Sequence, residues 1–356
     1  MNTPRPRRLS GVLAEMAARH PTGTLRFDEF MAVALYHERG GYYMGAEDIG
    51  GHRRDFATIP SLSPLLGLAI AKWALALPGS KSGPVDLIEV GAGGGHLAKA
   101  ILDGAGWWAR RRIRYRIVEK SPGLQRAQQD LLTGRKVTWH SSVIEAVSVS
   151  RGPVVLSNEL VDAFPCRLMR YERGTWRELR VPWPPASAQP FHSHLPADLD
   201  PTMFSSLEPG NLPAGQIPEN QVIEIHPSYR EWLQEWAGGV PGLNILTIDY
   251  GDTVRGLYEG RPKGSLRGYF SHQQLAGEAV LKAPGRVDLT SDVNFTDLAA
   301  WGTECGLHTV DLSDQAGFLN RWLPKKIRAA RAPDLKAIMD PDGAGGAFKV
   351  LWQVKG

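Results

Sequence analysis

The stretch "VDLIEVGAGGGHLAKAIL" (residues 85–102) holds the residue types and spacing that most directly suggest chemistry. An apolar run carries Glu89, and glycines follow at Gly91, Gly93 and Gly95 before a helical pattern begins. Glycines after a strand let the backbone come close to a ligand, and the next helix offers free N–H groups at its start. The stretch predicts a cofactor at a strand end, bound by Glu89, Gly91, Gly93 and Gly95, with an ordinary structural turn as the alternative.

The glycine spacing distinguishes between two classes of cofactor. The dinucleotide fingerprint is G-x-G-x-x-G, and its third glycine position is occupied here by His96. The E-x-G-x-G-x-G spacing that is present is typical of enzymes that use S-adenosylmethionine (SAM). SAM has no pyrophosphate, so the helix start needs only to approach the amino-acid end of the cofactor. We therefore predict SAM as the cofactor and disfavour a nicotinamide oxidoreductase.

Glu119 ends the second predicted strand, next to Lys120. In a doubly wound sheet an acid at this place accepts hydrogen bonds from both ribose hydroxyls of the cofactor. The alternative is a surface glutamate. We predict that Glu119 binds the ribose.

A group of acids follows the fourth predicted strand, in "SNELVDAFP". Acids packed this densely beside a cofactor site are costly unless they bind a cation or many donors. A guanidinium fits, because carboxylates hold its planar fork at two points. We predict catalytic roles for Glu159, for Asp162 as a second clamp and for Asn158 as the residue that orients the acceptor. Helix capping by Asn158 or Asp162 is the structural alternative.

Two histidines are candidates for the substrate side of the site. His226 or His272 would accept the proton if the acceptor is not arginine. A structural role is the more common one for histidines in such places.

Strands and helices alternate from residue 85 onwards, which predicts a parallel sheet covered on both faces. We expect strands at 85–90, 114–119, 136–140 and 153–158, then a hairpin over 166–181 that turns at Arg173-Gly174. The predicted domains are listed here: an N-terminal helical and loop segment over the cofactor site at 1–83, a core at 84–165 and 241–356, and an insertion at 166–240. The insertion contains a proline-rich loop at 182–219.

Composition argues against a metalloprotein, a membrane-spanning protein and a nucleic-acid-binding protein. The chain has 356 residues, is 42% hydrophobic and has a net charge of +4, with two cysteines far apart in sequence. We expect no metal site, because neither cysteine nor histidine spacing supports one. The longest apolar run, 64–79, carries Lys72 and is too short for a membrane span. Two arginine-rich runs lack a stacking platform, so a nucleic-acid partner is disfavoured. We expect a cytoplasmic protein in a bacterium, or a mitochondrial matrix protein in a eukaryote.

With these residues assembled, the chain resembles the MidA family of SAM-dependent methyltransferases. The resemblance is carried by the motifs "MAVALYHERGGYY", "RDFATIPSLSPLLG", "IEVGAGGGHLAKAIL", "YRIVEKSPGLQRAQ", "SNELVDAFP", "IEIHP", "LTIDYG", "GSLRGYFSH", "DLTSDVNFTDLA" and "FKVL". It implies an α/β, seven-stranded, doubly wound (Rossmann-like) methyltransferase fold, with an N-terminal helical segment over the cofactor and an insertion after strand 4. It also implies cofactor contacts from Asp55, Phe56 and Thr58, and an acceptor side lined by Tyr42 and Tyr43.

The resemblance implies methylation of a protein arginine, because the mitochondrial member of the family is associated with symmetric dimethylation of an arginine on a complex I subunit. The chain departs from the family pattern at Glu38, Arg54, Ser61 and Ala344, mostly near the expected acceptor site. We therefore predict a SAM-dependent methyltransferase that acts on a nitrogen of a protein or peptide. Two alternatives are a small-molecule or biosynthetic-peptide acceptor, and a non-catalytic assembly protein on the same scaffold.

Overall fold

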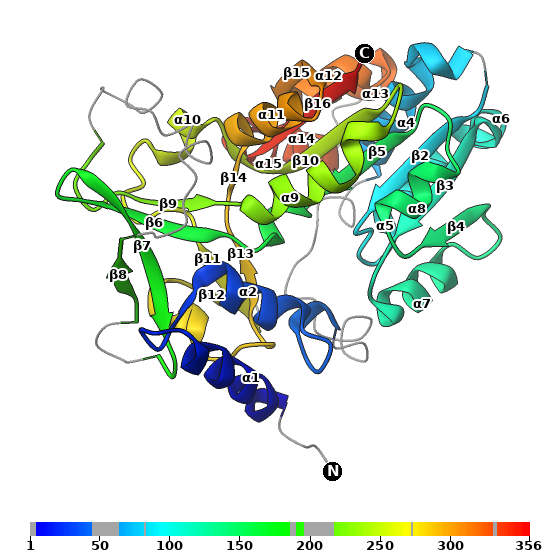
Figure 1. Cartoon of the computed structure of the whole chain (residues 1–356). Coiled ribbons are helices and arrows are strands. Elements are labelled where there is room, and N and C mark those ends of the chain that lie inside the picture. Colours follow the sequence, from blue (N-terminus) through cyan, green and yellow to red (C-terminus); the bar gives the residue numbers. More distant parts are fainter. Residues whose placement is uncertain are drawn as a thin grey trace. The chain divides into compact units, whose positions relative to one another are not determined.

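A computed structural model describes residues 5–44, 64–81, 83–185, 190–195, 217–271, 273–329 and 333–356. The chain divides into two compact units (Figure 1). One unit comprises residues 1–55, 162–231 and 252–297, and the other, which we call the sheet unit, comprises residues 56–161, 232–251 and 298–356. The helices α9 (Pro227–Trp236) and α11 (Phe295–Glu304) each run across a boundary between the units.

The sheet unit is built on a mixed sheet in which seven strands follow the order β15-β16-β10-β5-β2-β3-β4. The strands β2, β3, β4, β5 and β10 run parallel, and β16 is antiparallel to both of its neighbours. Their bounds are β2 Val85–Val90, β3 Ile113–Val118, β4 Val137–His140, β5 Val154–Asn158, β10 Asn244–Asp252, β15 Leu307–Asp314 and β16 Phe348–Lys355. The predicted seven-stranded α/β fold is confirmed, and the four predicted strands match β2 to β5 within one residue at each end.

Helices connect the strands of this unit, as the alternating pattern requires. Their bounds are α4 Leu65–Ala76, α5 His96–Gly104, α6 Gly106–Ala109, α7 Pro122–Leu131, α8 Val143–Ser148, α12 Gln315–Trp322, α13 Lys325–Ala329, α14 Pro333–Met339 and α15 Ala344–Ala347. The helix α7 begins where the sequence encodes it: Pro122 takes the first helical position and the Ser121 hydroxyl accepts from the Leu124 N–H.

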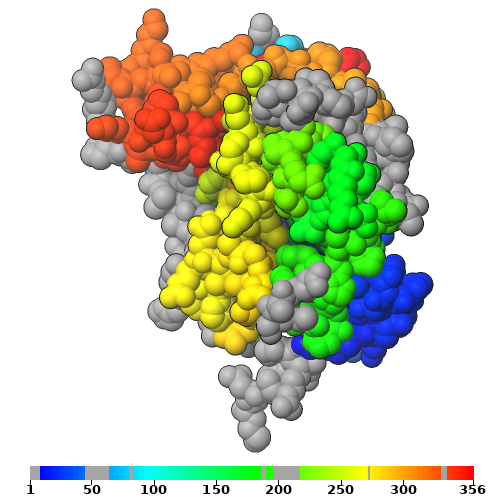
Figure 2. Space-filling model, turned by 90° about the vertical axis from the view of Figure 1, so that its left-hand side faces the viewer, coloured from blue at the N-terminus to red at the C-terminus, as the bar shows by residue number. Residues whose placement is uncertain are grey.

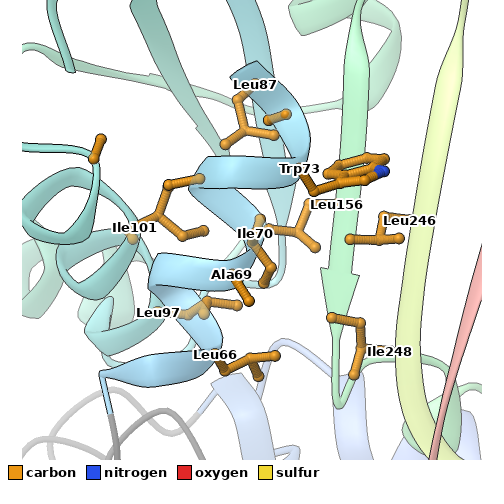
Figure 3. Close-up of a cluster of buried hydrophobic side chains, with 14 of the residues drawn as sticks. Leu66, Ala69, Ile70, Trp73, Leu87, Leu97, Ile101, Leu156, Leu246 and Ile248 are labelled. Carbon is orange, nitrogen blue, oxygen red and sulfur yellow. The ribbon is translucent and has the colours of Figure 1, made fainter. Parts of the chain in front are cut away.

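The core of the sheet unit explains why its strands form where they do. All six residues of β2 are buried, as expected of a central parallel strand. Figure 3 shows α4 side chains, among them Ile70 and Trp73, packed with Leu87 of β2, Leu156 of β5 and Leu246 of β10. The predicted boundaries placed α4 in the N-terminal segment, but its apolar faces pack into this core.

The other unit contains two antiparallel sheets. The first has the order β1-β7-β6-β9 with β8 paired to β7, and the second has the order β12-β11-β13. The bounds of its elements are α1 Arg5–Arg19, β1 Thr24–Arg26, α2 Phe27–Tyr36, β6 Arg167–Glu172, β7 Thr175–Pro182, β8 His192–His194, β9 Val222–Ile225, α10 Val254–Tyr258, β11 Arg267–Phe270, β12 Gln273–Leu275, β13 Asp288–Thr290 and β14 Val293–Asn294. Residues 252–297, expected in the core, belong to this unit.

The predicted hairpin is confirmed in this unit, because β6 and β7 pair and only Arg173 and Gly174 lie between them. Both residues have positive φ, 51° and 79°, as a tight two-residue hairpin turn demands. In Figure 2 the green segment that carries β6 and β7 lies beside the yellow segment that carries β11 and β12. The two segments are linked through β9, where Glu224 Oε1 accepts from the Ser265 N–H at 2.7 Å.

Candidate active site

The glycine turn after β2 has the open geometry that a cofactor needs. Gly91, Gly93 and Gly95 all have positive φ, at 68°, 52° and 81°. Among the residues that the structure describes, a Cβ added to Gly93 would meet no atom within 4 Å, whereas one added to Gly91 would lie 2.7 Å from Leu160 Cδ1. The turn is therefore open at Gly93, and at Gly91 it packs closely against the loop that follows β5.

Glu119 follows β3, and its carboxylate is held by donors from its own neighbourhood. Oε1 accepts from the Ser121 N–H at 2.9 Å, and Oε2 accepts from Gln128 Nε2 at 3.2 Å. Burial raises the pKa of Glu119, and the N–H donors of Ser121, Gln128 and Lys120 partly oppose that rise. A carboxylate has about four acceptor sites, so Glu119 keeps acceptor capacity beyond these three donors.

Glu89 is more deeply buried than a surface acid, with 3% of its surface exposed. The Tyr115 hydroxyl donates to Glu89 Oε2 at 2.7 Å. Burial raises the pKa of Glu89 to about 7, against the lowering effect of that hydrogen bond, and the nearby Glu119 adds to the rise. This acid therefore changes its protonation state close to neutral pH.

The loop after β5 holds Glu159 in an unusual backbone conformation. Glu159 has φ 50°, in the left-handed region that non-glycine residues seldom adopt. Its N–H donates to the Ile248 carbonyl at 3.0 Å, and its Oε1 accepts from Asn158 Nδ2 at 3.0 Å. Asn158 therefore orients the Glu159 carboxylate, and it does not cap a helix through this contact. Because β2, β3 and β5 are parallel, this loop lies at the same sheet edge as the glycine turn and Glu119.

Asp249, which holds this loop in place from the neighbouring strand β10, was not predicted as a site residue from the sequence. It is fully buried in β10, and its Oδ2 accepts from the N–H groups of Leu160 and Val161 at 3.1 and 2.8 Å. Its Oδ1 accepts from the Tyr250 N–H at 2.9 Å. An acid near the end of the strand beside β5, in "LTIDYG", was the available signal. Leu160 and Val161 lie 89 and 88 residues away in sequence, so only the fold identifies them as partners of Asp249.

The predicted acceptor residues Tyr42, Tyr43 and Asp162 lie in the other unit. The Tyr43 hydroxyl donates to Asp288 Oδ1 at 2.7 Å, and the Thr290 hydroxyl donates to Asp162 Oδ2 at 2.8 Å. Asp288 and Thr290 are two residues apart on β13, so their side chains are on the same face of that strand. Tyr42 packs edge-on against Tyr43, with ring centroids 5.1 Å apart.

Two titratable groups of this unit have pKa values shifted by burial. Burial raises the pKa of Asp162, opposed by the Thr290 hydrogen bond and by the charge of Arg267. Burial raises the pKa of Tyr43 well above its usual value, and the charges of Asp288 and Asp162 add to that rise. Tyr43 therefore stays a protonated hydrogen-bond donor beside two carboxyl groups.

His226 is placed in the interior of the same unit. Its Nε2 is 2.9 Å from the Ser291 hydroxyl, and only 2% of its surface is exposed. Burial lowers its pKa to about 4, so the ring is neutral over the physiological range. These contacts favour the structural role for this histidine. Four predicted residues, Asp55, Phe56, Thr58 and His272, lie outside the described residues.

The arrangement in the sheet unit suits a cofactor with a ribose and a charged amino-acid end. Among the described residues the turn is open at Gly93, which gives a ligand room to approach the backbone, and the Glu119 carboxylate keeps acceptor capacity for a further donor. Glu159, at the same sheet edge, has a carboxylate that Asn158 holds in place, and a carboxylate of this kind is chemically suited to a donor-rich or cationic ligand. In the part of the chain that the structure covers, no helix is long and apolar enough to cross a membrane.

Comparison with known proteins agrees with this chemistry. The Methyltransf_28 family model, described as "Putative S-adenosyl-L-methionine-dependent methyltransferase", matches residues 65–313. Similar proteins include "Protein arginine methyltransferase NDUFAF7, mitochondrial" of Danio rerio, which is 27% identical over 310 residues that cover 78% of this chain and 68% of that protein. The Drosophila melanogaster homolog is 27% identical over 375 residues, or 93% of this chain and 81% of its own length.

The fold is similar to solved structures as well. A crystal structure of a Burkholderia thailandensis protein bound to S-adenosyl-homocysteine (SAH) has a TM-score of 0.80 and 23% identity, over 100% of this chain and 95% of that one. At this identity the likeness supports the fold alone.

Proposed function

We propose a function that starts from family membership: this chain belongs to the Methyltransf_28 family of SAM-dependent methyltransferases. The proposed reaction transfers the methyl group of SAM to a guanidinium nitrogen of a protein arginine. The names of the Danio rerio and Drosophila melanogaster relatives support that acceptor. The matched region covers 68% of the Danio rerio protein.

The observation that carries the proposal is the conformation of Glu159. A non-glycine residue in the left-handed region costs about 1–3 kcal/mol and persists only where the surroundings fix it. Here the Glu159 N–H is bonded to β10, the next two N–H groups are bonded to Asp249, and Asn158 holds the carboxylate. The loop therefore uses several contacts to fix one carboxylate at the sheet edge that carries the cofactor residues.

The residues predicted to hold SAM fit that cofactor. Gly91, Gly93 and Gly95 would approach its amino-acid end, and Glu119 would accept from its two ribose hydroxyls. When bound, SAM supplies an activated methyl group and a neutral thioether leaving group. The remaining work falls to the protein: it aligns the acceptor, excludes water and manages one proton.

Glu159 would make an arginine nitrogen nucleophilic. A free guanidinium has a pKa of roughly 12.5–13.8, so its neutral form is scarce. A carboxylate bonded to one terminal nitrogen draws the positive charge toward that side and leaves electron density on the other nitrogen. That nitrogen forms the N–C bond as the S–C bond breaks, and one N–H proton leaves the product. Alignment of this kind contributes up to about 7–11 kcal/mol.

Asp162 would act as the second clamp or as the proton acceptor. Burial raises its pKa, so its carboxylate takes up a proton more readily than an exposed aspartate does. Tyr43, kept protonated by its own raised pKa, would donate a hydrogen bond on the acceptor side.

The test is a labelling experiment with a matched pair of variants. The purified protein is incubated with methyl-labelled SAM and a cell lysate, and labelled material is hydrolysed and separated into amino acids. We expect labelled methylarginine with the wild-type protein. Glu159→Gln should lower the rate about 100-fold or more while SAH still binds in calorimetry. Glu235→Gln, an exposed glutamate on α9, should behave as the wild type.

Other outcomes of the same experiment are informative. Label confined to small molecules would assign a different acceptor, and full activity in Glu159→Gln would remove Glu159 from the mechanism. SAH binding without any labelled product would favour a non-catalytic protein on the same scaffold.

A further inference from the structure

We propose that Gln128 is a positioning residue that joins the three parts of the cofactor site: the glycine turn, the Glu119 carboxylate and the strand end at Trp139. The inference rests on the cofactor site of the proposed function, but it is independent of the acceptor. Gln128 lies on α7, one turn from the helix end, and is fully buried.

Three hydrogen bonds connect Gln128 to three different elements. Its Nε2 donates to the Gly93 carbonyl at 2.9 Å, in the turn after β2, and to Glu119 Oε2 at 3.2 Å, after β3. Its Oε1 accepts from Trp139 Nε1 at 2.9 Å, on β4. Both N–H donors of the amide are used, and buried polar groups are costly when their partners are lost.

The network fixes the orientation of the amide. The indole N–H of Trp139 is only a donor, so Gln128 must turn its oxygen toward Trp139 and its nitrogen toward Gly93 and Glu119. Both of those partners are acceptors. A leucine of similar size would satisfy none of the three groups, and a glutamate would satisfy only Trp139.

Gln128 and Ser121 hold the Glu119 carboxylate from opposite oxygens. The Ser121 N–H donates to Oε1 and Gln128 Nε2 donates to Oε2, so each oxygen has a donor that fixes its position. Two neighbouring ribose hydroxyls need such a pair of acceptors at a fixed spacing. Without Gln128 the carboxylate would lose the donor that fixes Oε2.

The same side chain holds the turn that must approach the other end of the cofactor. Gly93 has positive φ, a Cβ there would meet no atom of the described residues within 4 Å, and its carbonyl accepts from Gln128. A Cβ added to Gly95 would lie 3.4 Å from Gln128 Cγ, so the glycine keeps this contact close. One residue therefore sets the positions of the ribose-binding acid and the turn together.

The test is SAH binding by calorimetry on full-length variants. Gln128→Leu should weaken SAH binding about 10- to 100-fold, with the binding stoichiometry unchanged. The matched control is Gln129→Leu, an exposed glutamine on the same helix, which should bind as the wild type. Affinity within about twofold of the wild type in a folded Gln128→Leu protein would overturn the inference. A lower binding stoichiometry with unchanged affinity would also overturn it, because that result means that part of the protein is misfolded and the rest binds SAH normally.

A second variant separates positioning from packing. Gln128→Glu places a carboxyl group beside Glu119, with the buried Glu89 as the next acid. Relative to the wild type at the same pH, its SAH affinity should rise as the pH is lowered, because the introduced carboxyl group takes up a proton and can donate again. Gln128→Leu should show no such recovery. A flat ratio for Gln128→Glu would contradict the positioning role.

Glu119→Gln distinguishes this inference from the cofactor site itself. If Glu119→Gln and Gln128→Leu both bind SAH normally, the assignment of Glu119 to the cofactor fails. If only Glu119→Gln weakens binding, that assignment stands and the role of Gln128 fails.

Discussion

Single residues set the contact distances at the proposed cofactor site, and Gly93 is the clearest example. Its φ of 52° is costly for a residue with a side chain. A Cβ added there would lie more than 4 Å from every atom of the described part of the chain, so a methyl group would displace none of them. We expect the added methyl group to collide with the bound cofactor.

Gly93→Ala should therefore damage binding more than folding. We expect SAH affinity to fall more than about tenfold, while the free energy of unfolding drops by only about 1–2 kcal/mol from the backbone strain. Calorimetry and urea unfolding measure the two effects. Gly134→Ala is the matched control, because Gly134 also has positive φ (77°) and open space but lies in the turn after α7. If Gly93→Ala loses as much stability as Gly134→Ala and its SAH affinity is unchanged, the cofactor does not bind at this turn.

At the scale of elements, the ends of neighbouring strands cooperate. The strand β10 pairs with β5 and contributes Asp249, which binds the N–H groups of Leu160 and Val161 just after Glu159. Hydrogen bonds to a charged partner contribute about 1.5–3 kcal/mol each. The carboxylate thus offsets the strain of the Glu159 conformation and fixes where the loop presents its acid.

Asp249→Asn should reduce methyl transfer and stability together. We expect the free energy of unfolding to fall by about 2–3 kcal/mol, because one oxygen that accepts backbone N–H groups becomes an NH₂ group. At a temperature where the variant remains folded, kcat should still fall more than about tenfold, while SAH binding is kept. Stopped assays and thermal unfolding give both values, with the exposed Asp130→Asn as control. A stable variant with normal kcat would show that Asp249 has no part in positioning the loop.

At the scale of the whole molecule, buried acids make stability depend on pH. Burial raises the pKa of Glu89 to about 7, above its usual 4.5, so the folded chain holds a proton that the unfolded chain has lost. Between pH 4.5 and pH 7 the free energy of unfolding falls as the pH rises, because the folded chain must keep or lose this proton at a cost that the unfolded chain does not have. Above pH 7 the full cost of the buried charge remains. From the size of the shift, that cost is about 3 kcal/mol.

Glu89→Gln should remove this cost. The amide oxygen can still accept from Tyr115, so the variant should be more stable than the wild type at about pH 8, by up to about 3 kcal/mol. The difference should become small below about pH 3.5, where the wild-type acid is mostly protonated in both the folded and the unfolded chain. Urea unfolding as a function of pH measures it. A difference that does not vary with pH would show that Glu89 titrates as an ordinary exposed acid.

Much of the fold and part of the site could be predicted from the sequence, because those features are encoded locally. The glycine spacing, the strand-helix alternation and the Arg173-Gly174 turn are patterns over short stretches, and each occurs where it was predicted. Glu119 could be singled out because a parallel sheet places the ends of its strands at one edge. The roles of the cofactor, catalytic and substrate residues remain predictions for the variants above to test.

The sequence by itself determined which cofactor class the chain serves and which strand ends carry its acids, since spacing along the chain sets both. Only the tertiary structure revealed the contacts that fix these groups. Asp249 reaches amides 89 and 88 residues away, Gln128 reaches a carbonyl 35 residues away, and Tyr115 reaches Glu89 across 26 residues. Burial, the left-handed turn at Glu159 and the raised pKa values arise from those distant partners, and no local pattern specifies them.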